Sequence, residues 1–137
     1  MNISVSQKLG SVTVTIISLN GRLDGKNFQE LIAKGQELYK AGARDVLLDL
    51  TDLSYISSAG MVAFHNIALL LRGEKPPSPE QGWNAYRSMG RSSSEGGTQE
   101  HFKLFNPQPE VDHILDMVGF NTIFKIYTDL DEAINSF

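Results

Sequence analysis

The chain has 137 residues, of which 12 are basic and 16 acidic, giving a formal net charge of -4 at pH 7. This length suits one domain with one hydrophobic core, and 41% hydrophobic and 20% charged residues are ordinary for a globular protein. The acidic balance argues against nucleic-acid binding, which requires a basic surface, and the absence of cysteine excludes disulfides and thiolate chemistry.

The N-terminal part of the chain predicts a pair of strands. Residues 3–9 alternate apolar and polar side chains, and residues 12–19 are rich in β-branched side chains, which suit a pleated surface. Leu9-Gly10-Ser11 is a plausible hairpin turn between them. We expect Asn20-Gly21 to end the second strand.

A helix and a third strand should follow. After Asp24 the apolar residues recur at helical spacing, at Phe28, Leu31, Ile32, Leu38 and Tyr39. Gly35 lies on the same face, which favours a helix packed close against a sheet. Gly42 is placed to end this helix, and residues 46–50 form a short apolar run typical of a strand covered on both faces.

The middle of the chain changes character at residue 73. A helix is predicted from Ala59 or Gly60 to about Arg72. Residues 73–100 then hold three prolines, five glycines and five serines with almost no apolar periodicity. We expect a flexible insertion here, within a single domain that spans residues 1–137.

The C-terminal part returns to alternating elements. Residues 101–105 predict a strand, and an apolar stripe at i, i+3, i+4 and i+7 starting at Val111 predicts a helix that Gly119 would end. Residues 124–127 predict one more strand. Thr128 is a candidate cap for a last helix over residues 129–136.

This order of elements predicts the fold class. Strands that alternate with helices form sheets whose βαβ units are parallel and right-handed, while the N-terminal hairpin is antiparallel. The expected fold is therefore α/β, with a mixed sheet of about five strands and about four helices.

Ser57 and Ser58 stand at the start of a helix that is otherwise poor in polar residues. Either hydroxyl could cap the helix by accepting a bond from a free amide. A hydrolase nucleophile would need a glycine on each side, whereas only Gly60 is present, and no histidine is spaced as its partner. A phosphate-binding loop would need several glycines and a lysine, which are missing.

The same stretch carries a family resemblance. Residues 49–61, DLTDLSYISSAGM, resemble the signature of the STAS domain family, which is shared by sulfate transporters and bacterial anti-sigma factor antagonists. Gly21-Arg22-Leu23-Asp24 is similar to the family's Gly-x-Leu-Asp element. Residues 111–137 are similar to its C-terminal end. The resemblance covers the chain except for residues 73–100.

The resemblance implies a function without catalysis or cofactor. In the family, a kinase anti-sigma factor with a histidine-kinase-like ATP fold phosphorylates the serine that corresponds to Ser58, and a metal-dependent serine phosphatase removes the phosphate. The chain departs from the family pattern at Ser57, where an acidic residue is usual, and at Ala59, where a second hydroxyl is usual.

A partner surface is expected around Ser58. On a helical projection Val62 and Leu69 fall outside the core-facing arc and are flanked by His65 and Asn66, so they form either a docking stripe or a surface covered by the insertion. By resemblance Asp24 would lie near Ser58, although it could simply cap the first helix. The expected partner-binding residues are Asp24, Ser57, Ser58, Val62, His65, Asn66 and Leu69.

Two functional hypotheses follow. In the first, the chain is an anti-sigma factor antagonist that binds a kinase anti-sigma factor when Ser58 is unphosphorylated. In the second, it is a constitutive adaptor in a signalling scaffold or transporter complex. The N-terminus lacks the pattern of a signal peptide, and the longest apolar run, near residues 61–71, is too short to cross a bilayer. We therefore expect a cytoplasmic protein without membrane insertion.

Overall fold

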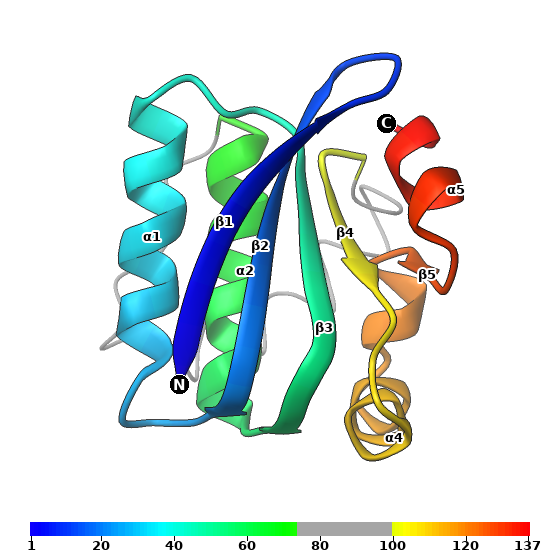
Figure 1. Ribbon diagram of the computed structural model, residues 1–137. Coiled ribbons are helices and arrows are strands. Elements are labelled where there is room, and N and C mark those ends of the chain that lie inside the picture. The colour runs from blue at the N-terminus through cyan, green and yellow to red at the C-terminus, as the bar shows by residue number, and fades with distance from the viewer. Residues whose placement is uncertain (74–99) are drawn as a thin grey trace.

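The computed structural model describes residues 1–73 and 100–137, which form a five-stranded mixed sheet with helices on both faces (Figure 1). Its strands, in spatial order, are β1 (Asn2–Leu9), β2 (Thr13–Leu23), β3 (Val46–Ile56), β4 (Phe102–Phe105) and β5 (Ile126–Tyr127). β1 is antiparallel to β2, and every later pair is parallel. The predicted mixed sheet of about five strands is confirmed.

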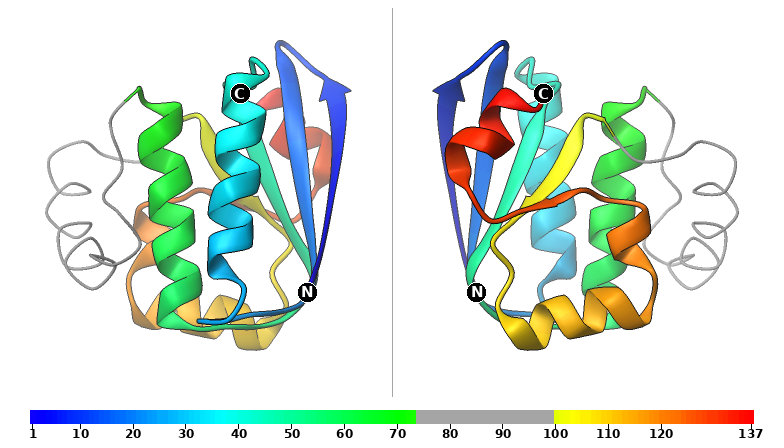
Figure 2. Two further views of the ribbon diagram at one scale, coloured as in Figure 1. Left: turned by 90° about the vertical axis from the view of Figure 1, so that its left-hand side faces the viewer. Right: turned by 90° about the vertical axis from the view of Figure 1, so that its right-hand side faces the viewer.

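Four α-helices complete the described part of the domain. They are α1 (Phe28–Lys40), α2 (Ser58–Leu71), α4 (Pro109–Met117) and α5 (Leu130–Asn135), and a single 3-10 turn covers Phe120–Thr122. α1 and α2 lie on one face of the sheet and α5 on the other (Figure 2). The predicted α/β class is confirmed. The insertion expected over residues 73–100 lies almost wholly outside the described residues.

Each face of the sheet has its own hydrophobic cluster. The larger one joins the sheet to α1, α2 and α4, and at its centre the Phe102 ring meets Phe64 and Phe124 edge to face, with centroids 6.1 and 5.3 Å away. The smaller cluster lies under α5. It consists of Val14, Ile16, Leu47, Ala133 and Ile134.

β2 and β3 both run further than predicted. Asn20-Gly21 does not end β2, which continues to Leu23, and β3 continues past Leu50 to Ile56. Gly21 adopts a φ of +112°, and the register between the two strands shifts there, so the pair resumes with Leu23 opposite Ile56. The extra residues remain in strands because β2 and β3 form backbone hydrogen bonds with each other. Local sequence propensity does not include this pairing.

The ends of the later elements also differ from the prediction. Asp129, not Thr128, caps α5, because its side chain accepts a 3.0 Å hydrogen bond from the Glu132 amide. The last strand is limited to Ile126–Tyr127, since Phe124 is buried in the core after the 3-10 turn. Gly119 follows α4 with a φ of +79°, as expected for a glycine that ends a helix.

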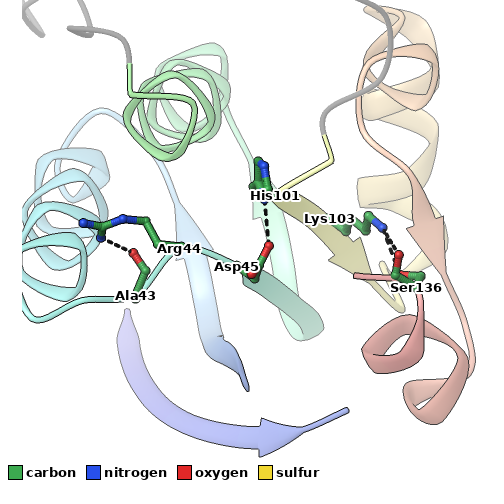
Figure 3. Close-up of polar contacts among 6 residues, drawn as sticks. All are labelled: Ala43, Arg44, Asp45, His101, Lys103 and Ser136. Atoms are coloured by element: carbon green, nitrogen blue, oxygen red, sulfur yellow. Dashed lines mark hydrogen bonds and ion pairs between the residues drawn. The ribbon is translucent and has the colours of Figure 1, made fainter. Parts of the chain in front are cut away.

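Lys103 is a buried cation between β4 and α5. Its Nζ donates hydrogen bonds to the carbonyl oxygen of Ser136 at 2.9 Å and to the Ser136 hydroxyl at 3.0 Å (Figure 3), and it lies 4.6 Å from the Phe137 ring centroid. Burial lowers the pKa of the Lys103 ammonium, because desolvation penalises the charged form. Near the same end of the sheet, His101 Nδ1 lies 2.8 Å from Asp45 Oδ1 (Figure 3). The C-terminal end of the chain is therefore tied to the sheet by polar as well as apolar contacts.

Gly35 permits close packing of α1 against α2, rather than against the sheet as the sequence suggested. A Cβ atom at Gly35 would lie 2.8 Å from Ile67 Cγ1 and 3.1 Å from Ile67 Cδ1. Two neighbouring helices on the same sheet face contact each other as well as the sheet. The glycine therefore sets the distance between the two helices.

Replacing Gly35 by alanine should lower the free energy of unfolding by about 1–3 kcal/mol, because overpacking outweighs the gain in helix propensity. Chemical denaturation measures this change. Gly25→Ala is the matched control, since nothing lies within 4 Å of its Cβ position.

The Ile67→Ala substitution removes the side-chain atoms that oppose a Cβ atom at position 35. In this background Gly35→Ala should therefore lower the free energy of unfolding by less than it does in the wild type. Equal costs in both backgrounds would show that the two residues do not oppose each other.

Candidate functional site

The two serines occupy different positions at the start of α2. Ser57 is the N-cap, and its hydroxyl accepts a 3.4 Å hydrogen bond from the Gly60 amide. Ser58 is the first helical residue, and its side chain is exposed to solvent. Capping is therefore the role of Ser57, and the Ser58 hydroxyl is accessible to an enzyme.

Two contacts hold the first turn of α2 against the ends of β2 and β3. The Ser57 amide donates a 2.9 Å hydrogen bond to the carbonyl of Leu23. A Cβ atom at Gly60 would lie 2.8 Å from Leu23 Cγ and 2.9 Å from Ile56 Cγ1. Only glycine fits without displacing these buried side chains. Close packing therefore explains the glycine at position 60.

Asp24 lies at the same end of the sheet, directly after Leu23. Its Oδ1 accepts a 2.9 Å hydrogen bond from the Lys26 amide, and its own amide donates to Asn27 Oδ1 at 2.9 Å. Asn27, rather than Asp24, is the N-cap residue of α1. Asp24 therefore does not cap α1 with its side chain, and it follows the residue whose carbonyl accepts the hydrogen bond from the Ser57 amide.

The helix beyond the serines is buried more completely than its sequence pattern suggests. Val62 and His65 are each 5% exposed and Asn66 is 3% exposed, while Leu69 is half-buried. Three of the four residues of the predicted docking stripe are therefore not exposed in the structure, and Leu69 is partly accessible. The alternative reading, a surface covered by the insertion, falls on residues outside the described ranges. The helical projection assumed one buried face, but α2 packs against α1 as well as against the sheet.

Asn66 illustrates the consequence of this burial. It lies between α1 and α2, beside Ile32, Gln36, Ile67 and Leu70. Its Nδ2 atom makes no hydrogen bond. An unpaired buried amide costs stability, and the residue cannot contact a partner without rearrangement of the helices.

The charge pattern at the start of α2 favours an anion. The first turn contains no acidic residue, and the amides at a helix N-terminus carry a partial positive charge. Arg22 immediately precedes Leu23 on β2, and its guanidinium carbon sits 4.4 Å from the centroid of the Tyr55 ring. Leu23 and Ile56 face Gly60 of α2, so strand alternation directs the side chains of Arg22 and Tyr55 to the other face of the sheet.

Two kinds of site find no support in the described ranges, 1–73 and 100–137. They contain no group of three histidine, aspartate or glutamate side chains that could hold a metal ion. They also contain no helix with the length and apolar character needed to span a membrane.

Comparison with solved structures identifies proteins with the same fold. The chain resembles an anti-sigma factor antagonist from Mycobacterium paratuberculosis, with a TM-score of 0.63 and 14% identity over 98% of this chain and 93% of that chain. It resembles a putative anti-sigma factor antagonist from Thermotoga maritima with a TM-score of 0.65 and 23% identity, over 95% and 91% of the two chains.

The anti-sigma factor antagonist SpoIIAA in its unphosphorylated form is also similar, with a TM-score of 0.53 and 16% identity over 96% of this chain and 94% of that chain. SpoIIAA from Bacillus has also been solved in a phosphorylated form. A comparison with curated protein sequences finds no match. Identities this low demonstrate the fold alone.

Membership of a family rests on sequence. The model of the STAS domain matches residues 5–74, which is just over half of the chain and includes both serines, Asp24 and Gly60. Together with the shared fold, this match shows that the chain belongs to the STAS domain family.

Proposed function

We propose that this protein is an anti-sigma factor antagonist that works as a serine phospho-switch. Unphosphorylated, it binds a kinase anti-sigma factor through the α2 N-terminus. The kinase transfers the γ-phosphoryl group of ATP to the Ser58 hydroxyl, releasing ADP and a proton, and a serine phosphatase hydrolyses the phosphoserine. The observation that carries the proposal is the exposure of Ser58 at the N-terminus of a helix that is otherwise largely buried.

Accessibility distinguishes Ser58 from its neighbours. A kinase must enclose the target hydroxyl, which requires an exposed side chain in a position that the substrate does not need for its own stability. Ser57 is half-buried and engaged as the cap, whereas Ser58 is exposed and outside the capping interaction. The local geometry therefore favours modification of Ser58 over Ser57.

The scaffold can accept a phosphate at Ser58 without unfolding. A phosphoserine carries close to two negative charges at neutral pH, and at the first helical position these face amides that favour an anion. The consequence of phosphorylation should therefore fall on the partner rather than on the fold.

The partner surface that we propose centres on Ser58, Ser57 and Asp24, with the half-buried Leu69 at its margin. Val62, His65 and Asn66 are buried and are not included in this surface. A partner that packs over the helix start would bury the phosphate or meet it with acidic groups. A loss of about 3 kcal/mol from desolvation and repulsion weakens binding more than a hundredfold.

Membership of the STAS family and the fold shared with anti-sigma factor antagonists support this assignment. The existence of a phosphorylated form of one of those proteins, SpoIIAA from Bacillus, supports the switch. A constitutive adaptor is the alternative, and it requires no phosphorylation of Ser58. Phosphorylation and affinity therefore distinguish the two functions.

Incubation with the cognate kinase anti-sigma factor and ATP should add one phosphate per chain at Ser58, because only this hydroxyl at the helix start is exposed. Mass spectrometry of the intact protein and its peptides measures this. Ser58→Ala should remain unmodified, and phosphate on Ser57 or no phosphate at all would contradict the proposal.

The charge at residue 58 should control affinity. Ser58→Asp should weaken binding to the same kinase at least about tenfold, which corresponds to about 1.4 kcal/mol, and isothermal calorimetry measures it. Ser58→Asn, which has the same shape without the charge, should bind within a few-fold of the wild type. Equal affinities of the aspartate and asparagine variants would favour the adaptor.

Substitution of Ser57 should affect helix capping without affecting phosphorylation of Ser58. Ser57→Ala removes the acceptor of the Gly60 amide and should lower the free energy of unfolding by about 0.5–1 kcal/mol. Ser58 should still be phosphorylated in this folded variant. Thermal denaturation and the phosphorylation assay together measure the two effects, and loss of phosphorylation in the folded variant would show that the kinase requires the Ser57 hydroxyl itself.

A further inference from the structure

The outer edge of β1 is open. β1 stands at the border of the sheet and, among the described strands, pairs only with β2 (Figure 2). Seven of its eight residues are exposed, Ile3 being half-buried. A strand of this kind presents a row of backbone groups to which another strand can add.

The register of the sheet identifies those backbone groups. The Thr15 amide donates to the carbonyl of Asp45, beside β3, at 2.9 Å. Backbone groups alternate in direction along a strand, so the even-numbered residues of β2 face β1, and they pair with even-numbered residues of β1. The odd-numbered residues of β1 therefore point their N–H and C=O groups away from the sheet. They are Ile3, Val5, Gln7 and Leu9.

This edge has few of the features that usually prevent pairing. β1 contains no proline or glycine and no register shift, and it carries one charged side chain, Lys8, which lies 3.7 Å from Asp131 of α5. Apolar side chains are exposed on the same hairpin, with Val5 40%, Val12 39% and Leu9 78% exposed. Natural edge strands usually carry free charges, prolines or bulges instead.

We propose that β1 binds β1 of a second copy of this chain. The two strands run antiparallel about a twofold axis at Val5, and the two sheets join into one continuous sheet. A twofold interface requires a surface that is complementary to itself. This proposal is independent of the proposed phospho-switch.

Backbone direction and side-chain chemistry select the register. Residues that bond across the new edge must both be odd-numbered. With Val5 opposite Val5 of the second copy, Leu9 faces Met1 and Lys8 faces Asn2, so no like charges meet. Two of the registers that the backbone allows place both exposed apolar side chains of β1 opposite apolar side chains: this one, and the register centred on Gln7, in which Val5 faces Leu9. The register centred on Val5 pairs residues 2–8 of each strand, whereas the register centred on Gln7 pairs only residues 5–9, so the former forms the longer interface.

Neighbouring structure supports an added strand. In Figure 1 α1 extends past the β1 border of the sheet, so a strand added there would be backed by this helix. The interface remains small, because one strand pair buries less than the roughly 1,200–2,000 Å² of a standard stable complex. The dimer should therefore be reversible and depend on protein concentration.

Cysteine substitution tests the register directly, because the chain contains no cysteine. In a hydrogen-bonded antiparallel pair, opposite Cα atoms lie about 5.5 Å apart, within the range of a disulfide. Val5→Cys should therefore form a covalent dimer on oxidation or with a crosslinker that reaches only an adjacent side chain. Non-reducing electrophoresis measures it.

Gln7→Cys is the matched control, since Gln7 is equally exposed but faces Ile3. The two substituted positions would lie about 14 Å apart along the paired strands, beyond the reach of a disulfide. This variant should stay monomeric on the gel. Equal crosslinking of both variants would overturn the proposed register.

Sedimentation equilibrium of the unmodified chain supplies the second measurement. A monomer–dimer equilibrium should appear as the concentration rises through the micromolar range. Val5→Pro should abolish it, because proline removes the outward N–H while the bonds to β2 remain intact. A wild-type chain that stays monomeric throughout, or a dimer that persists in Val5→Pro, would overturn the proposal.

Discussion

The close approach of the first turn of α2 to the ends of β2 and β3 is the constraint on which the site depends. Gly60 leaves no room for a Cβ atom beside Leu23 and Ile56, and the Ser57 amide is bonded to the Leu23 carbonyl. These contacts hold the helix start at one end of the sheet. Ser58, one residue into the helix, is consequently exposed at a position that cannot drift, which suits recognition by an enzyme.

The buried and the exposed parts of α2 have different roles in the proposed function. Most of α2 is buried, and it includes buried polar residues that a less constrained helix would expose. Ser58 is exposed at the start of this helix, where the amides favour negative charge. In the function that we propose, a phosphate there changes the surface that a partner contacts while the hydrophobic clusters stay intact, so binding would respond to charge without a change of fold.

Much of the fold was predictable because it depends on local pattern. The β-branched runs, the helical spacing before Gly42 and the motif around Ser58 indicated the elements, their order and the family. The errors arose where tertiary contacts outweigh local propensity. β2 and β3 are longer than predicted because they pair with each other in parallel. Gly35 faces Ile67 of α2 rather than the sheet. A helical projection cannot show that Asn66 lies against α1, because it contains no neighbouring helix.

The sequence by itself determined the class of fold, the family and the pair of serines at a helix start, because periodicity, turn residues and motifs are local properties. Only the tertiary structure decided which serine caps the helix and which faces solvent. It also decided that Arg22 and Asp24 lie at the end of the sheet where α2 begins, and that β1 forms an open edge. These properties depend on how strands pair and helices pack, and burial arises from contacts between residues far apart in the chain.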